Sequence, residues 1–218
     1  MKLSHRLRMG AFVLSIAASF CLYPITAHAV TAAERAAAEQ AEAERQATYS
    51  KTIDSNSIEN WPQGPQIYAE SAIVMEASTG TILYNKDMDM VNYPASITKI
   101  MTALVALEHC SLDDIVTYSY YATHSIEAGS SSIGTTEGEE LTVEQLLNVL
   151  LIPSANDAAV ALAEHIAGSV EAFAEMMNNK AKEIGCLDTH FINPNGVHND
   201  DHYSTAYDLA LMGRYAMQ

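Results

Sequence analysis

From residue 66 onward, the alternation of apolar and polar residues predicts a mixed α/β (α+β) domain. The stretch IYAESAIVMEA is apolar and rich in strand-forming residues, STG supplies a turn, and TILYNKD continues the apolar pattern. Two such runs joined by a short loop with glycine are typical of a β-hairpin, here over residues 68–86. A further short strand is predicted in SLDDIVTYS.

Helical periodicity follows the hairpin in several segments, in which apolar residues recur three and four positions apart. The segments are ASITKIMTALVALEH, LTVEQLLNVLLI, SANDAAVALAEHIAG, SVEAFAEMMNNKAKEIG and STAYDLALMGRYAM. Pro153 separates the second from the third, and Gly185 ends the fourth. Two stretches rich in turn residues, SSSIGTTEGEE and FINPNGVHNDDH, are predicted loops.

The chain begins with the pattern of a secretory signal peptide, which we assign to residues 1–29. Three basic residues precede or open an apolar stretch that ends at the small-x-small site Ala27-His28-Ala29. A membrane anchor is the alternative, although the apolar stretch is short for a membrane span. Residues 30–65 are first rich in Ala and Glu and then in polar and turn residues, so we expect a tether and a linker there. The domain is then expected over residues 66–218.

Composition and charge narrow the class of protein. The chain has 218 residues, of which 49% are hydrophobic, so one domain with a sizeable core is expected. Its net charge is −16 without a basic stripe, which argues against a nucleic-acid partner. Cys21 would be removed with the signal peptide, and the sequence leaves open whether Cys110 and Cys186 form a disulfide.

One lysine, Lys99, lies among apolar residues one helical turn after Ser96. Side chains three residues apart on a helix are neighbours, so the amine and the hydroxyl can meet. The positive end of the helix dipole and apolar surroundings would disfavour the ammonium form, and a free N–H of Ser96 could stabilise an oxyanion. A neutral amine beside a hydroxyl is a general base beside a nucleophile. The alternative is a capping serine and a lysine whose tip reaches water.

A second motif, PSANDAA, places Ser154 and Asn156 at the start of another helix. The alternative is structural, because Ser154 and Asp157 match a capping box. However, Ser-x-Asn downstream of Ser-x-x-K is a signature of penicillin-binding proteins and serine β-lactamases.

Longer matches in the same order extend the similarity to most of the predicted domain. They are MEASTGTILYNKDMD, YPASITKIMTALVALEH, LTVEQLLNVLLIPSANDAAVALAEHIAG and THFINPNGVHNDDHYSTAYDLA. From residue 66 to its end the chain resembles the low-molecular-weight penicillin-binding proteins that are D-alanyl-D-alanine carboxypeptidases. The resemblance implies a penicillin-binding protein/β-lactamase-like fold, in which an antiparallel sheet is flanked by helices and accompanied by a helical subdomain.

The resemblance also implies a role for each candidate residue. Ser96 would be the nucleophile that forms the acyl-enzyme, and Lys99 would deprotonate it. Ser154 would relay the proton to the leaving D-alanine, and Asn156 would bind the backbone of the substrate. The implied substrate is the pentapeptide stem of peptidoglycan outside the cytoplasm, β-lactams would acylate Ser96, and neither a metal nor an organic cofactor is implied.

The third motif of that family, Lys-Thr-Gly, is absent. Lys51-Thr52 is followed by Ile53, and in the family the motif lies on a strand beyond the YSTAYDLA helix, in which this sequence ends. We therefore expect about the N-terminal two thirds of a catalytic domain, without its last strands and without the membrane-anchoring helix that often follows. We expect these 218 residues alone to be poorly active and poorly stable.

Two alternatives remain, a serine β-lactamase of related fold and an inactive peptidoglycan-binding remnant. EQLLN resembles a string of class A β-lactamases, but there it follows Ser-x-Asn, whereas here it precedes Ser154. We therefore expect Glu144 to be solvated and Leu146 and Leu147 to lie in the core. HNDDH, residues 198–202, is interpreted as a loop without metal.

Overall fold

The computed structural model describes residues 31–218, so the predicted signal peptide lies outside the described residues. The chain divides into two compact units at residues 45 and 46. Helix α2 (Ala32–Tyr49) begins in the first unit and has no buried residue. Thr31 and Glu34 form a reciprocal cap at its start. Within the described residues, no helix is both long enough and apolar enough to cross a bilayer.

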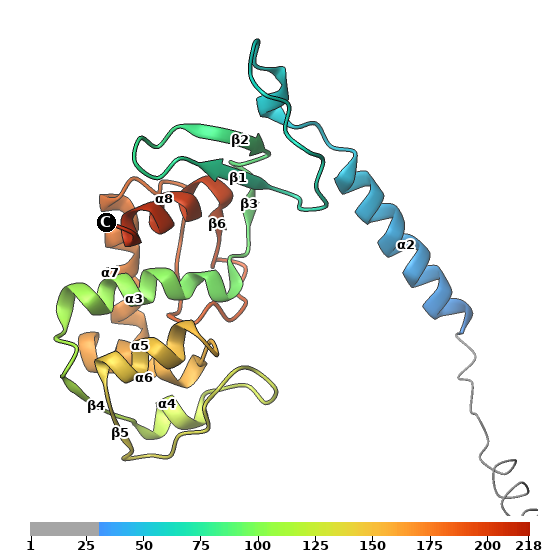
Figure 1. Ribbon diagram of the computed structural model, residues 1–218. Coiled ribbons are helices and arrows are strands. Elements are labelled where there is room, and N and C mark those ends of the chain that lie inside the picture. The colour runs from blue at the N-terminus through green and yellow to red at the C-terminus, as the bar shows by residue number, and fades with distance from the viewer. Residues whose placement is uncertain (1–30) are drawn as a thin grey trace, which may run out of the picture. The chain divides into compact units, whose positions relative to one another are not determined.

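The predicted hairpin is confirmed. Strands β1 (Ala72–Met75) and β2 (Ile82–Lys86) pair antiparallel, with Ala72 opposite Lys86. Glu76 shapes the turn, because its carboxylate accepts hydrogen bonds from the backbone N–H groups of Ser78 and Thr79 at 3.1 and 2.6 Å. The hairpin packs on helix α8 (Ala206–Ala216), as Figure 1 shows.

A buried lysine attaches the preceding segment to this hairpin. Lys86, which is fully buried, donates hydrogen bonds from Nζ to the carbonyl oxygens of Thr48 and Ile67 at 2.8 and 2.7 Å. The short 3₁₀ helix η1 (Asp54–Ser57) contacts β2. The start of the domain at residue 66 stays a prediction. Part of the segment before residue 66 nevertheless packs against β2, as the contacts of η1 and the hydrogen bond from Trp61 Nε1 to the Leu83 carbonyl show.

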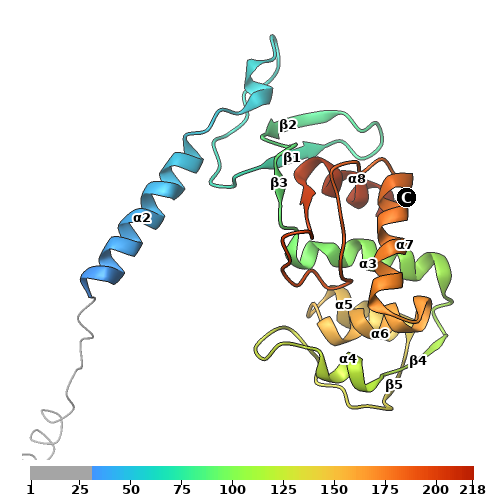
Figure 2. The ribbon, with the colours of Figure 1, turned by 180° about the vertical axis from the view of Figure 1, so that it is seen from behind.

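The predicted helices are confirmed, with α3 at the centre of the larger unit. Besides α8 they are α3 (Lys99–His109), α5 (Val143–Leu151), α6 (Asn156–Ala167) and α7 (Val170–Glu183). Helix α3 contacts all four of the others, with the hairpin and α8 on one side and α5 and α6 on the other in both views (Figures 1 and 2).

Short elements complete the architecture of the described residues. They are strands β3 (Val91–Asn92), β4 (Ile115–Thr117), β5 (Glu140–Thr142) and β6 (Ser204–Thr205), and helix α4 (Tyr120–His124). Strand β3 pairs with β6, and β4 pairs with β5, both antiparallel. The strand predicted in SLDDIVTYS is β4. Helices combined with small antiparallel sheets confirm the predicted α/β (α+β) class.

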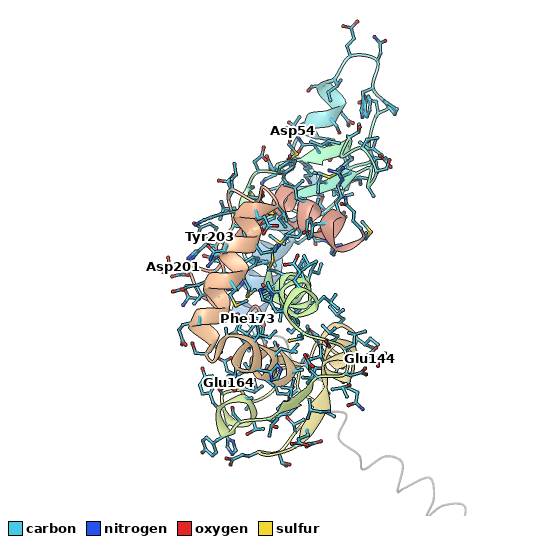
Figure 3. The ribbon with its side chains drawn as sticks, turned by 90° about the vertical axis from the view of Figure 1, so that its left-hand side faces the viewer. Asp54, Glu144, Glu164, Phe173, Asp201 and Tyr203 are labelled. Carbon is cyan, nitrogen blue, oxygen red and sulfur yellow. The ribbon has the colours of Figure 1, made fainter. Side chains whose placement is uncertain are left out.

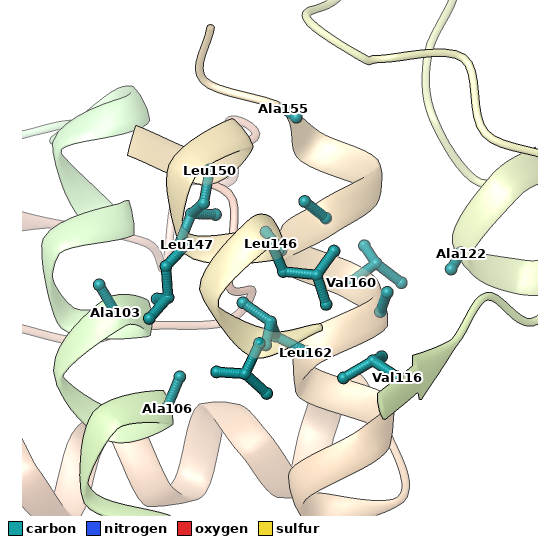
Figure 4. Packing of buried hydrophobic residues seen from close by; sticks show 14 of the residues in the cluster. Ala103, Ala106, Val116, Ala122, Leu146, Leu147, Leu150, Ala155, Val160 and Leu162 are labelled. Atoms are coloured by element: carbon teal, nitrogen blue, oxygen red, sulfur yellow. The ribbon is translucent and has the colours of Figure 1, made fainter. Parts of the chain in front are cut away.

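Two apolar clusters hold the helices together. The first lies between α3, α5 and α6, where Leu146, Leu150 and Leu162 are fully buried (Figure 4). The second joins α3, α7 and α8 and includes the fully buried Phe173 of α7, which is labelled in Figure 3. Glu144 lies exposed on the outer side of α5, as predicted. These clusters position the first turn of α3 and the start of α6.

Candidate active site

Ser96 lies in a 3₁₀ turn, η2 (Ala95–Thr98), directly before α3. The sequence predicted the first turn of an α-helix instead. The difference arises because Ile97 donates its N–H to the Pro94 carbonyl, which closes the tighter turn. Ala95 has φ 47°, a left-handed conformation that is uncommon outside glycine. The turn leaves Ser96 exposed while Lys99 is only 2% exposed.

The Lys99 amine contacts the Ser96 hydroxyl directly. Its Nζ donates to Ser96 Oγ at 3.2 Å and to the Asn195 carbonyl oxygen at 2.8 Å. Burial lowers the pKa of Lys99 to about 8, since a buried ammonium loses its hydration. The alternative in which the lysine tip reaches water is therefore wrong.

The loop at residues 193–196 supplies the second contact of Lys99. The sequence predicts only a turn-rich loop there, so it does not reveal this contact. Asn193 Oδ1 accepts the N–H of Gly196 at 2.7 Å and closes the turn. Gly196 has φ +81°, and a Cβ there would lie 1.8 Å from the Ala95 carbonyl oxygen. Only glycine allows this close approach to the turn that carries Ser96. The glycine was the one available signal, but the sequence does not show what approaches it.

His202 holds the turn that carries Ser96 through a hydrogen bond to Thr98. Its Nδ1 accepts the N–H of Ile192 at 3.1 Å, so Nε2 carries the proton and donates to Thr98 Oγ1 at 2.9 Å. Burial and the nearby His190 lower the pKa of His202 to about 4. The neutral imidazole is therefore a buried structural group, although the sequence placed it in a loop of no special role.

The Ser-x-Asn motif lies at the start of α6 without capping it. The N-cap is Ala155 and no side chain caps the helix, so the capping-box alternative is wrong. Asp157 instead accepts hydrogen bonds from Ser132 Oγ and Thr135 Oγ1 at 2.8 and 3.1 Å. Its carboxylate thus ties the Gly/Ser-rich loop to α6.

Ser154 and Asn156 carry polar atoms that the fold does not use. Ser154 has φ 63°, again a left-handed conformation. Ser154 Oγ and Asn156 Oδ1 are buried and have no hydrogen-bond partner among the described residues. Strained backbone and unpaired buried oxygens are costly and cluster at functional sites.

A cavity of about 180 Å³ lies between α6 and the loop at residues 193–197. Asn156 lines it together with Asn193, Pro194 and Asn195, the loop that holds Lys99. Asn156 at the start of α6 and Asn195, whose carbonyl oxygen accepts from Lys99 Nζ, thus line one hollow.

Comparison with known proteins identifies the family. The family described as D-alanyl-D-alanine carboxypeptidase matches residues 58–218. The chain belongs to this family. Among its members, DacF of Bacillus subtilis is 45% identical over 148 residues, which are 67% of this chain and 38% of DacF. DacD of Escherichia coli is 38% identical over 161 residues, which are 70% of this chain and 42% of DacD.

Solved structures of the D-alanyl-D-alanine carboxypeptidase family share the fold. Penicillin-binding protein 6B from Escherichia coli is 37% identical with a TM-score of 0.69, over 78% of this chain and 54% of that one. DacD from Francisella tularensis is 37% identical with a TM-score of 0.68, over 74% of this chain and 40% of that one. These matches confirm the predicted family and fold. The chain spans about two fifths of the length of its curated relatives DacF of Bacillus subtilis and DacD of Escherichia coli.

Proposed function

We propose that the protein is a serine-type D-Ala-D-Ala carboxypeptidase that acts through an acyl-enzyme on Ser96. The observation that carries the proposal is the 3.2 Å contact between Lys99 Nζ and Ser96 Oγ, with the amine buried and the hydroxyl exposed. Because the pKa of Lys99 is about 8, a fraction of its amine is neutral near pH 7, and a general base must be neutral to accept a proton.

In the first half of the reaction, neutral Lys99 takes the proton of Ser96 as Oγ attacks the carbonyl carbon of the penultimate D-alanine. The tetrahedral intermediate then collapses, the C–N bond breaks, and the leaving D-alanine nitrogen takes up a proton. The product is an ester on Ser96. In the second half, water attacks this ester and gives a proton to the base. The ester bond to Ser96 then breaks, and the base returns the proton to Ser96 Oγ.

Ser154 and Asn156 complete the proposed machinery. Ser154 Oγ, which has no partner in the described residues, is available to pass the proton to the leaving nitrogen. Asn156 Oδ1, equally unpartnered, is available to accept an N–H of the substrate backbone. A bound peptide would satisfy both buried oxygens, which explains why the fold tolerates them.

The substrate we propose is the stem pentapeptide of peptidoglycan, and β-lactams would acylate Ser96 in its place. The predicted signal peptide supports export, with action in the extracytoplasmic cell envelope and roles in peptidoglycan biosynthesis, cell-wall organisation and cell shape. We also propose peripheral association with the membrane. The net charge of −16 gives no basis for binding nucleic acid.

Covalent labelling with a fluorescent penicillin tests the proposal. We expect the label on the tryptic peptide that contains Ser96, none on Ser96→Ala, and full labelling of the control Ser57→Ala, which alters an exposed serine. D-Alanine released from a peptide ending in D-Ala-D-Ala is then measured on the same variants. Equal labelling of Ser96→Ala would contradict the assignment, and no labelling of any variant would indicate an inactive peptidoglycan-binding remnant.

The lifetime of the penicillin adduct separates a carboxypeptidase from a serine β-lactamase. A β-lactamase needs a group that activates water for rapid deacylation, and Glu144, which resembles one in sequence, lies exposed on the outer side of α5. We therefore expect a long-lived adduct. Rapid return of free enzyme with hydrolysed penicillin would favour the β-lactamase.

A further inference from the structure

A cluster of three different metal-ligating side chains lies outside the proposed active site. Cys110 follows the last residue of α3, Asp114 lies in the turn before β4, and His165 lies in the last turn of α6. Their sulfur, carboxylate oxygen and imidazole nitrogen atoms all lie within 4.8 Å of one another. Cys110 is half-buried, and the other two residues are exposed. The end of α3 and the turn just after it therefore meet the end of α6, more than 50 residues later in the sequence, at one point.

The spacing suits a zinc ion. With zinc–ligand bonds of about 2.0–2.3 Å, the ligand atoms of a tetrahedral site lie about 3.5 Å apart. The three atoms need to close by roughly an ångström from their 4.8 Å limit, which rotation of exposed side chains provides. Thiolate, imidazole and carboxylate are all zinc ligands, and a fourth position would remain for water.

The turn around Asp114 already orients its carboxylate. Asp114 Oδ2 accepts the N–H of Ser111 at 2.8 Å, and the backbone N–H of Asp114 donates to the Ser111 carbonyl at 3.1 Å. Hydrogen bonds of this kind fix a ligand before the metal arrives. The cluster therefore has a preset oxygen ligand and lies at the ends of two packed helices.

A cysteine, a histidine and an aspartate could also form a nucleophilic triad, but the surroundings of Cys110 do not support one. Its backbone N–H is bonded to the Ala106 carbonyl at 3.0 Å and is not available to an oxyanion. Burial and the Asp114 carboxylate raise the pKa of the Cys110 thiol, the opposite of what an activated nucleophile needs. A divalent cation would reverse that effect by binding the thiolate directly.

We propose that Cys110, Asp114 and His165 bind a zinc ion that joins the end of α3, the turn before β4 and the end of α6. Binding releases the thiol proton to solvent as the zinc–sulfur bond forms, and no redox change is involved. The site is independent of Ser96 chemistry. Its consequence is structural, because an ion that binds only the folded chain stabilises it.

Cobalt(II) titration of the whole chain, kept reduced with a phosphine, tests the proposal. We expect one saturable site with a thiolate-to-cobalt charge-transfer band and ligand-field bands of tetrahedral intensity, all displaced by zinc. Cys110→Ser should abolish the charge-transfer band. Asp114→Asn and His165→Gln should weaken binding at least tenfold. Cys186→Ser is the matched control, since Cys186 is also a free thiol but lies outside the cluster.

A second readout is the melting temperature, which zinc should raise for the wild type and for Cys186→Ser but not for Cys110→Ser. Circular dichroism checks that each variant is folded, and the exposed positions of Asp114 and His165 make their variants the safest. Binding that needs Cys110 but is unchanged in both Asp114→Asn and His165→Gln would indicate an isolated thiol and overturn the proposal. Absence of any saturable cobalt spectrum would do the same.

Discussion

Lys99 is a buried amine whose two hydrogen-bond acceptors, the Ser96 hydroxyl and the Asn195 carbonyl, are both uncharged. Burial alone lowers its pKa to about 8. The neutral fraction of this amine is then a minority at pH 7 and grows about tenfold per pH unit below the pKa. The reactivity of Ser96 and the stability of the fold should both follow this titration.

Acylation by penicillin should therefore speed up with pH. We expect the second-order rate constant to rise about tenfold per unit up to roughly pH 8 and then level off, because the base is the neutral amine. Lys99→Arg, which stays protonated, should lose about 10²–10⁴-fold in rate. Lys180→Arg is the control, since Lys180 pairs with Glu108 and Glu183 outside the proposed machinery. A rate independent of pH between 6 and 9 would contradict the role of Lys99.

The same titration predicts a change in stability. The pKa of Lys99 is about 8 in the folded chain, against an ordinary value of 10.5. Between these values the unfolded chain binds more protons, so the free energy of unfolding should rise with pH from about 8 to 10.5. Urea unfolding across this window should show the rise in the wild type and not in Lys99→Met. Parallel curves for the two proteins would mean that the amine is not buried in solution.

At this scale the sequence predicted the Ser96–Lys99 contact because three-residue spacing on a helical turn is a local rule. It could not predict the Asn195 carbonyl, which is 96 positions away and belongs to the backbone rather than to a recognisable side chain. The sequence also left the capping box open at Ser154 and Asp157. The structure excludes it, because the helix is capped at Ala155 and no side chain caps it.

At the scale of elements, the loop at residues 193–196 is packed against the turn that carries Ser96. Gly196→Ala should disturb both, because its Cβ would lie 1.8 Å from the Ala95 carbonyl oxygen. Gly185→Ala is the matched control, with φ +91° but open space around its Cβ. The control should lose about 1–2 kcal/mol from left-handed strain alone. Gly196→Ala should lose more and should also slow penicillin acylation, whereas equal effects would contradict the contact.

Replacing Lys86 should lower the free energy of unfolding more than replacing Lys51, which pairs with the adjacent Asp87. Lys86→Met leaves the carbonyls of Thr48 and Ile67 without their buried donor, which should cost about 1–3 kcal/mol for each. Lys51→Met removes only a partly exposed ion pair with Asp87, for which we expect about 0–1 kcal/mol. Chemical denaturation compares the two variants. A smaller loss for Lys86→Met than for Lys51→Met would show that the segment before the hairpin is not anchored this way.

The helices and the first hairpin were predictable because their apolar periodicity extends over many residues. Strands β3 and β6 were not, since each has two residues and their pairing joins Val91 to Thr205 across most of the domain. Helix α4 was missed for a similar reason: five residues are too short for a periodic signal.

At the scale of the whole molecule, an apolar hollow of about 400 Å³ opens on the face formed by α3, the end of α5 and α8. Leu107 and Leu151 line it and are 54% and 55% exposed. Exposed apolar surface of this kind favours association. The sequence had predicted poor stability of these 218 residues on their own, and the hollow adds a structural reason to test how the chain behaves in solution.

We expect the isolated chain to associate as its concentration rises, measured by sedimentation velocity. Leu107→Glu should reduce association by placing a charge in the hollow. Leu187→Glu is the control, because Leu187 is 80% exposed but does not line the hollow. Association reduced equally by both variants would argue for a general solubility effect, and a monomer at all concentrations would contradict the expectation.

Because the acceptor that steadies the Lys99 amine is a main-chain oxygen, no substitution of the Asn195 side chain removes it, and it carries no charge that could lock the amine in its protonated form. Directed evolution that retunes the reactivity of this centre should therefore act through the burial of the amine or the geometry of the loop at residues 193–196, rather than through exchange of its partner.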